Sequence, residues 1–251
     1  MGKRRPRHGG QAGGLLNSSP GPGPLVSIIV PVYNEAATVT AVIDRLLTIS
    51  LPADREIIVV NDGSTDGTRG ALQPLEGTPR LRIVHVERNR GKGHAIRLGI
   101  ASAIGDVVAI QDADLELDPA QLATLVKPIL DGETDVVYGS RFLDGTPNAP
   151  QLTLIANRTL TAITNLLYGS SLTDMETCYK IMRASVAKSL DLKADRFDIE
   201  PEITARLLTG GHTIAERPVT FTPRSRAAGK KIGWRDGVVA IKVLFRHRFG
   251  R

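Results

Sequence analysis

Two acidic residues, Asp112 and Asp114, stand one residue apart directly after the apolar run Val107-Val108-Ala109-Ile110. A β-strand that ends there would bring both carboxylates to the carboxyl edge of a sheet, where open α/β folds bind their ligands. Residues i and i+2 of a strand share a face, and a turn at the strand end can direct both carboxylates to one hard cation such as Mg²⁺ or Mn²⁺. Such a cation can neutralise a leaving diphosphate. An isolated Asp-x-Asp is more often an acidic cluster that caps a loop, so a metal-binding role also needs support from the neighbouring motifs.

The first apolar run ends in Pro31-Val32-Tyr33-Asn34-Glu35. Pro31 interrupts a strand, and Asn34 is expected to cap the following helix. Ordinary strand-to-helix punctuation explains these two residues, but it does not explain an aromatic residue and an acid beside them. We therefore expect Tyr33 and Glu35 to lie exposed at the sheet edge and to serve a function.

Two glycine-rich segments follow the next strands. Asn61-Asp62-Gly63-Ser64-Thr65-Asp66-Gly67-Thr68 reads as a turn with a helix cap, but Asp62 needs a further reason, which a base or ribose could supply. Gly91-Lys92-Gly93 offers close backbone approach and a cation near a phosphate. Because Ile96 stands where a dinucleotide motif has its third glycine, and no P-loop is present, these segments count against dehydrogenases and kinases.

Short β-branched runs alternate with helix-like segments from Leu25 onward. The expected strands are 26–30, 56–60, 81–86, 107–110 and 136–138. The expected helices between them are 36–48, 65–75, 92–103 and 119–130. This alternation predicts a largely parallel sheet covered on both faces. After a helix at 151–168 the rhythm changes to mixed α+β, with segment 178–182 strand-like, 200–208 helical and 213–221 extended, before a basic loop at 222–231.

The two ends of the chain differ from its middle. Residues 1–24 are rich in Gly, Pro, Ser and basic side chains and predict a disordered tail. Residues 233–251 predict an amphipathic basic helix, with Trp234, Val238, Ile241, Leu244 and Phe245 near one face. Docking of this helix on the domain and its insertion in a membrane interface are about equally good interpretations.

Composition narrows the partners. The formal net charge is +6 with the basic residues gathered at both ends, yet aromatic residues make up only 4% and no nucleic-acid module is visible. We expect no nucleic acid as partner, and an anionic membrane surface or a phosphorylated substrate fits better. The single cysteine, Cys178, excludes an intramolecular disulfide. No run approaches the roughly 18 apolar residues of a membrane span and no signal peptide is visible, so a cytoplasmic, non-spanning protein is expected.

The chain carries three motifs in this order: Pro31-Val32-Tyr33-Asn34-Glu35, Asn61-Asp62-Gly63-Ser64-Thr65-Asp66-Gly67 and Asp112-Ala113-Asp114. Together they resemble the motifs of the inverting family 2 glycosyltransferases, which have the A-type nucleotide-diphospho-sugar transferase fold. The resemblance runs from about Leu25 to Gly237 and implies an α/β protein with a Rossmann-like mixed sheet flanked by helices. It also places the catalytic domain at residues 25–232. The second half is similar to the dolichyl-phosphate mannose synthase and polyprenyl-phosphate glucosyltransferase branch in three motifs: Thr173-Asp174-Met175-Glu176-Thr177-Cys178-Tyr179-Lys180, Phe197-Asp198-Ile199-Glu200-Pro201-Glu202-Ile203 and Gly229-Lys230-Lys231-Ile232-Gly233-Trp234-Arg235-Asp236-Gly237.

The resemblance implies a role for each matching residue. The nucleotide-sugar-binding residues would be Pro31, Tyr33, Glu35, Asp62, Lys92 and Asp112. Mg²⁺ or Mn²⁺ would bind Asp112 and Asp114, with Glu116 as a third ligand. The acceptor-phosphate-binding residues would be Arg141, Arg158, Arg224 and Lys230, although charge runs such as the one at 224–231 usually only face water. Asp114 and Asp174 would be catalytic, and Asp174 could be a base or could orient Arg141 or the acceptor.

The expected reaction is inverting, metal-dependent transfer of a hexose from a UDP- or GDP-sugar to a polyprenyl phosphate. It would occur at the cytoplasmic membrane surface, with the protein peripheral on the inner face of the plasma membrane. The second pKa of a phosphate monoester is about 6, so its attacking oxygen is already largely anionic at neutral pH and needs no strong base. Many polyprenyl-phosphate transferases carry transmembrane helices, which this chain lacks. A soluble family 2 enzyme with a hydrophilic acceptor is one alternative. A non-catalytic module that binds membranes or nucleic acid is the other.

Overall fold

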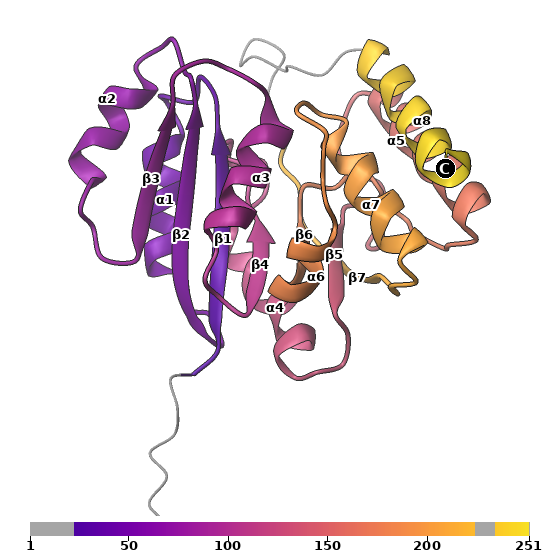
Figure 1. The fold of residues 1–251 in the computed structure, drawn as a ribbon, viewed down its shortest axis with the longest axis horizontal. Coiled ribbons are helices and arrows are strands. Elements are labelled where there is room, and N and C mark those ends of the chain that lie inside the picture. The colour runs from indigo at the N-terminus through magenta and orange to yellow at the C-terminus, as the bar shows by residue number, and fades with distance from the viewer. Residues whose placement is uncertain (1–22, 224–233, 251) are drawn as a thin grey trace, which may run out of the picture.

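The strands of the described chain form one mixed sheet in the order β3-β2-β1-β4-β6-β5-β7 (Figure 1). The computed structural model describes residues 23–223 and 234–250, with side chains from residue 237 onward in the second range. The strands are β1 (Leu25–Val32), β2 (Asp54–Asp62), β3 (Leu81–Val86), β4 (Val107–Ile110), β5 (Val136–Ser140), β6 (Lys180–Arg183) and β7 (Ala215–Pro218). The expected A-type, Rossmann-like architecture is confirmed.

One strand makes the sheet mixed. β1 runs parallel to β2 and β4, and β5 runs parallel to β7. β6 lies antiparallel between β4 and β5, with Ile181 opposite Ala109 and Lys180 opposite Tyr138. The first residue of β6 therefore lies at the edge where β4 and β5 end. This arrangement brings the loop before β6 to the carboxyl edge that carries Asp112.

Helices cover both faces of the sheet. The α-helices are α1 (Val39–Thr48), α2 (Thr68–Leu72), α3 (Lys92–Ser102), α4 (Leu122–Leu130), α5 (Gln151–Tyr168), α6 (Ala184–Ser189), α7 (Ile199–Thr209) and α8 (Trp234–Phe249), and the 3₁₀ helices are η1 (Gln73–Leu75) and η2 (Pro119–Gln121). α3 and α6 lie on the opposite face of the sheet from α1 (Figure 1). α1 buries Val39, Val42, Ile43 and Leu46, which is the spacing of one helical face.

The central strands are buried on both faces. Residues 26–32 of β1 are all buried, as expected for a parallel strand with helices on each side. α3 packs closely on β1, because a Cβ atom at Gly99 would lie only 2.3 Å from Ile29 Cγ2. The main core therefore forms around β1, β2 and β4 and holds their carboxyl ends in fixed positions.

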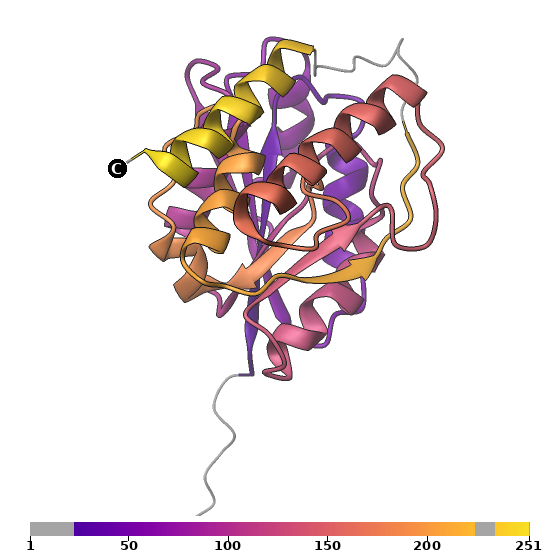
Figure 2. The ribbon, with the colours of Figure 1, turned by 90° about the vertical axis from the view of Figure 1, so that its right-hand side faces the viewer.

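Three helices form a second, smaller core beside the sheet. α5 and α8 lie side by side and pack with α7 (Figure 2). Their shared core contains Leu160, Met175, Ala205, Ala240 and Leu244. Of the α8 face expected from the sequence, Leu244 is buried and Ile241 partly buried, whereas Val238 and Phe245 are 43% and 46% exposed. α8 is thus docked on the domain and keeps some apolar surface exposed.

Several local expectations need correction. Asn34 does not cap α1, whose N-cap is Thr38. Asn34 has a positive φ of 55°, and its Oδ1 accepts a hydrogen bond from the Thr65 backbone N–H at 2.8 Å, which ties the loop after β1 to the loop after β2. Glu35 is buried rather than exposed, and its Oε2 accepts a hydrogen bond from the Thr38 hydroxyl at 3.0 Å. α6 was not expected.

Two expectations fall almost wholly outside the described residues: the disordered tail at 1–24 and the basic loop at 222–231. Among the helices that the structure does describe, none has the length and apolarity needed to cross a bilayer.

Candidate active site

Asp62 holds the loop that leads into α3. Its buried carboxylate accepts hydrogen bonds from the backbone N–H groups of Arg90 at 3.0 Å and Gly91 at 2.6 Å, both through Oδ2. Its Oδ1 lies 3.4 Å from Nδ1 of His94. In this structure Asp62 therefore joins the end of β2 to the start of α3, and its contact with a nucleoside stays a prediction.

The two glycines around Lys92 allow a second segment to cover the start of α3. Gly91 has a φ of +115°, and a Cβ atom there would lie 2.4 Å from the Asp195 carbonyl oxygen. A Cβ atom at Gly93 would lie 2.4 Å from the carbonyl oxygen of Ala194. The 194–195 backbone can approach this closely only because both positions lack a side chain. This packing accounts for both glycines without a phosphate.

Lys92 links Asp112 to Glu200 in the first turn of α7. Its Nζ lies 2.8 and 3.1 Å from the two carboxylate oxygens of Asp112 and 2.9 Å from Oε1 of Glu200. Burial opposes the charge on Lys92, but the carboxylates of Asp112 and Glu200 outweigh it and hold the pKa of Lys92 well above its usual value. Lys92 is thus a fixed cation beside Asp112.

Gln111 anchors the loop that carries Asp112 and Asp114 through hydrogen bonds of its side-chain amide. The buried Gln111 amide donates to the carbonyl oxygens of Asp112 at 3.0 Å and Leu117 at 3.2 Å, and accepts from the Tyr179 hydroxyl at 2.7 Å. Asp114 Oδ1 accepts the backbone N–H of Glu116 at 3.0 Å. Gln111 was not among the expected site residues, although a polar residue directly after a buried strand was a usable signal.

Carboxylates of this kind suit a hard divalent cation, because Mg²⁺ and Mn²⁺ prefer oxygen ligands. Within residues 23–223 and 234–250, however, no three His, Cys, Asp or Glu side chains are grouped as a metal site. The assignment of Glu116 as a third ligand beside Asp112 and Asp114 therefore stays a prediction. A cation bound to the two aspartates would complete its coordination shell with further oxygen ligands, such as water molecules.

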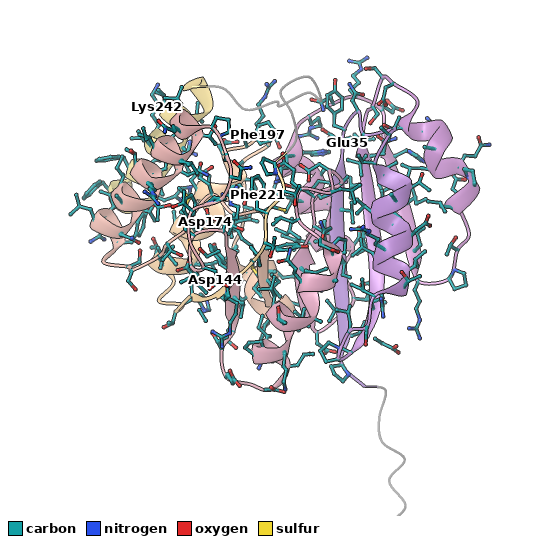
Figure 3. The ribbon with its side chains drawn as sticks, turned by 180° about the vertical axis from the view of Figure 1, so that it is seen from behind. Glu35, Asp144, Asp174, Phe197, Phe221 and Lys242 are labelled. Carbon is teal, nitrogen blue, oxygen red and sulfur yellow. The ribbon has the colours of Figure 1, made fainter. Side chains whose placement is uncertain are left out.

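A partly buried arginine forms an ion pair with a fully buried aspartate at the end of β5. Arg141 follows β5 and binds Asp174, with Nε 2.7 Å from Oδ2 and Nη2 2.8 Å from Oδ1, and the Arg141 backbone N–H also donates to Oδ2 at 3.0 Å. Asp174 is fully buried, and the guanidinium lies 5.4 Å from the centre of the Phe221 ring (Figure 3). Burial opposes the charge on Arg141, but Asp174 outweighs it and raises the pKa of Arg141.

The segment that carries Asp174 is anchored by Glu216 of β7. Glu216 Oε2 accepts from the Thr173 backbone N–H at 2.8 Å and hydroxyl at 2.9 Å, and Oε1 accepts from the Asp174 backbone N–H at 3.1 Å. Burial raises the pKa of Glu216. Sequence reasoning missed this residue.

Arg141 engages both carboxylate oxygens of Asp174. This geometry suits an Asp174 that orients Arg141 better than an Asp174 that removes a proton from a substrate.

The remaining acceptor candidates are less tightly held. Arg158 is exposed on α5, where its Nη2 donates to the Thr146 hydroxyl at 2.9 Å and its guanidinium lies 5.6 Å from the Phe142 ring centre. It therefore lies over the loop that Arg141 begins. Arg224 and Lys230 lie outside the described residues, so their assignments stay predictions.

The chain segment after β7 contacts both the loop that carries Asp112 and Asp114 and the side chain of Arg141. Phe221 forms an isolated antiparallel bridge with Leu117, and the Thr222 backbone N–H donates to the Glu116 carbonyl oxygen at 2.9 Å. Phe221 also lies beneath Arg141. The loop that carries Asp112 and Asp114 and the partly buried Arg141 are thus joined through one residue, whose backbone pairs with Leu117 and whose ring contacts the guanidinium.

Charged side chains also connect Asp112 to the loop before β6. Glu200 Oε2 lies 2.7 Å from Nζ of Lys180, which also donates to the carbonyl oxygens of Met175 at 3.0 Å and Thr177 at 2.5 Å. With Lys92, this makes a chain of alternating charge from Asp112 to the loop before β6. Glu200 and Lys180 were also not among the expected site residues.

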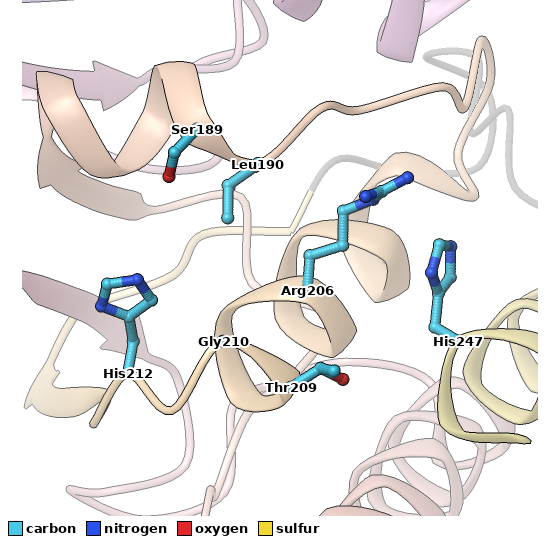
Figure 4. A pocket seen from close by; sticks show the side chains of 7 residues that line it. All are labelled: Ser189, Leu190, Arg206, Thr209, Gly210, His212 and His247. Carbon is cyan, nitrogen blue, oxygen red and sulfur yellow. The ribbon is translucent and has the colours of Figure 1, made fainter. Parts of the chain in front are cut away.

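A pocket lined by Ser189, Leu190, Arg206, Thr209, Gly210, His212 and His247 lies elsewhere, at the ends of α6, α7 and α8 (Figure 4). None of the expected site residues lines it. This pocket is therefore separate from the candidate active site.

Comparisons with known proteins agree on the family. The profile of glycosyl transferase family 2 matches residues 27–191. The chain is 31% identical over 216 residues to a dodecaprenyl-phosphate galacturonate synthase of Rhizobium johnstonii, which covers 82% of this chain and 61% of that relative. It is 29% identical over 217 residues to a polyprenol monophosphomannose synthase of Mycolicibacterium smegmatis, with 82% and 80% covered.

Other matches extend the comparison. The glycosyltransferase AglD of Haloferax volcanii is 30% identical over 207 residues, and the match spans only 33% of that longer protein. The crystal structure of glucosyl-3-phosphoglycerate synthase from Mycobacterium tuberculosis with Mn²⁺, UDP and glucosyl-3-phosphoglycerate superimposes with a TM-score of 0.69. That match covers 90% of this chain and 80% of the other at 22% identity, so it shows the fold alone.

Proposed function

The chain belongs to glycosyl transferase family 2, and from that premise we propose that it transfers a hexose from a UDP- or GDP-sugar to a polyprenyl phosphate with inversion. The names of two relatives include such lipids: one is a dodecaprenyl-phosphate galacturonate synthase and the other a polyprenol monophosphomannose synthase. The match spans 61% of the galacturonate synthase and 33% of the Haloferax volcanii glycosyltransferase AglD. The lipid acceptor is therefore our proposal for this chain.

One observation carries the proposal: a partly buried, preoriented arginine lies at the same sheet edge as the aspartate pair. Arg141 uses Nε and Nη2 for Asp174, so Nη1 is the nitrogen that an anionic ligand could engage. A phosphate monoester fits such a site, because its oxygen is largely anionic at neutral pH and needs no base. That chemistry is compatible with an Asp174 whose two oxygens are both held by Arg141.

The chain's own residues would divide the work. Asp112 and Asp114 would hold Mg²⁺ or Mn²⁺, which when bound would neutralise charge on the leaving diphosphate. Lys92 balances the charge of Asp112 and keeps it in place. Arg141, together with the exposed Arg158 on α5, would place the acceptor phosphate in line with the sugar. Bringing two anionic substrates together in this way is a large part of the catalysis required.

We also propose that the enzyme binds peripherally to the cytoplasmic membrane surface through α5 and α8, which lie side by side (Figure 2). These helices expose large apolar side chains: Leu152, Ile155 and Leu166 on α5, and Val238, Val239, Phe245 and Phe249 on α8. Exposed bases such as Lys242 accompany them (Figure 3). Each base near an anionic leaflet would contribute about 1 kcal/mol.

Replacing both Phe245 and Phe249 with serine is expected to weaken binding to phosphatidylserine vesicles at least about tenfold, because each ring would lose apolar contact with the membrane. Vesicle flotation measures this. Ile104→Ser is the matched control, since Ile104 is 70% exposed but lies two residues after the end of α3, away from α5 and α8 in the sequence. Unchanged flotation of the double variant would remove α8 from the membrane proposal.

The reaction itself is tested by nucleoside diphosphate release from UDP-glucose and GDP-mannose with Mg²⁺ or Mn²⁺, with and without a short-chain polyprenyl phosphate. We expect release with one donor, stimulated by the lipid phosphate. Nucleotide-sugar binding without such stimulation would contradict a lipid-phosphate acceptor and direct the search to hydrophilic acceptors.

A further inference from the structure

Glu176 occupies a central place in the loop that leads into β6. Its neighbours on both sides are anchored at the end of β5, since Asp174 binds Arg141 and the Thr177 hydroxyl donates to the Gly139 carbonyl oxygen at 2.6 Å. The Glu176 side chain is partly buried, and its Oε1 is shielded from solvent without a hydrogen-bond partner in the described structure. A buried carboxyl oxygen in this state is unfavourable until a ligand or a proton satisfies it.

The cations around Glu176 are already paired with other carboxylates. Arg141 binds Asp174, and Lys180 binds Glu200. The charged groups that act on Glu176 come from the loop after β5, from β6, from α7 and from its own loop; they are Arg141, Lys180, Glu200 and Asp174. These four formal charges cancel, so an ionised Glu176 would be an additional negative charge in a neutral environment.

Burial is the main reason that this environment favours the protonated form. It raises the pKa of Glu176 from 4.5 to about 7. Lys180 and Arg141 act against this shift, whereas Glu200 and Asp174 support it. Near neutral pH the side chain can therefore carry a proton, and a protonated carboxyl group can donate one hydrogen bond.

We propose that Glu176 is an acceptor-binding residue, whose protonated carboxyl group donates a hydrogen bond to the phosphate monoester that Arg141 holds. This inference rests on the proposed function. A hydrogen bond from a carboxylic acid to an anionic oxygen is short and strong, whereas an ionised carboxylate would repel the phosphate. The anion bound by Arg141 would itself favour the protonated state of Glu176, because a nearby negative charge disfavours ionisation.

The opposite role would be a general base for a hydroxyl acceptor, and the two roles predict opposite pH dependence. The experiment measures kcat/KM for a short-chain polyprenyl phosphate, followed by nucleoside diphosphate release, across the range from about pH 5.5 to 8.5. For the wild type we expect a rise through about pH 6, as the acceptor phosphate ionises, and a fall above about pH 7. Glu176→Gln keeps a donor but cannot ionise, so we expect it to lose the fall.

Below about pH 6.5, Glu176→Gln should retain activity within a few-fold, whereas Glu176→Ala should raise the KM for the lipid about tenfold. Glu133→Gln is the control, because Glu133 is exposed and pairs with Arg217, and it should keep the wild-type profile. A Glu176→Gln profile that matches the wild type would overturn the inference. So would a wild-type rate that rises through pH 7 and is lost in Glu176→Gln. A wild type that the lipid does not stimulate at any pH would instead overturn the proposed function.

Discussion

Replacing Asp114 with asparagine is expected to lower turnover by about 10²–10³-fold or more while leaving the fold intact. An asparagine side-chain oxygen can still accept the Glu116 backbone N–H, so the loop should keep its shape. The change removes the negative charge that a divalent cation requires from its ligand. Lipid-stimulated nucleoside diphosphate release measures the activity, and Mn²⁺ titration by calorimetry measures metal binding independently.

The chain offers a close control four residues away. Asp118 Oδ1 accepts the Ala120 backbone N–H at 3.1 Å, which is the same local geometry as the contact between Asp114 and Glu116. Asp118 is exposed and is not an expected ligand. Asp118→Asn should therefore keep nearly wild-type turnover and Mn²⁺ affinity. Wild-type rates or undiminished Mn²⁺ binding in Asp114→Asn would remove Asp114 from the metal site.

The first half of the fold could be predicted from the sequence because its signals are local. β1 to β5 are short β-branched runs, each bounded by turn residues, and the helices between them show a regular apolar face. The position of β6 could not be predicted in this way. The run 178–182 indicates a strand, but nothing in it specifies an antiparallel place between β4 and β5. Strand order depends on contacts between distant segments.

The same limit applies to the site. Asp112 and Asp114 are recognisable because they follow closely after a strand, and the resemblance of the motifs supplied Arg141. Glu200 and Glu216 were missed because their partners are distant in sequence: Glu200 is 20 residues from Lys180, and Glu216 is 43 residues from Thr173. Asn34 was misinterpreted as a local cap for a similar reason, since its partner Thr65 is 31 residues away.

The buried charge network has a structural meaning of its own. Buried ion pairs add little net stability compared with apolar packing, but breaking one by removing a single partner is costly. The chain Asp112–Lys92–Glu200–Lys180 and the pair Arg141–Asp174 therefore specify where side chains lie more than how stable the protein is. This distinction determines how a variant of Arg141 has to be interpreted.

Replacing Arg141 with methionine is expected to reduce the free energy of unfolding by about 3–5 kcal/mol. Two of the three hydrogen bonds to the fully buried Asp174 would be lost, and only the one from the backbone N–H of residue 141 would remain. Urea unfolding measures this change. Arg183→Met is the control, because the pair of Arg183 with Asp135 is 39% and 53% exposed and should contribute at most about 1 kcal/mol.

Combining Arg141→Met with Asp174→Asn separates the structural role of Arg141 from its role with the acceptor. The double variant no longer buries an unpaired carboxylate, so it should regain most of the lost stability. Its lipid-stimulated turnover should nevertheless stay about 10²-fold or more below wild type, since the guanidinium that binds the phosphate is absent, while nucleotide-sugar affinity should be unchanged. If turnover returned together with stability, Arg141 would serve only to neutralise Asp174, and the acceptor phosphate would have to bind elsewhere.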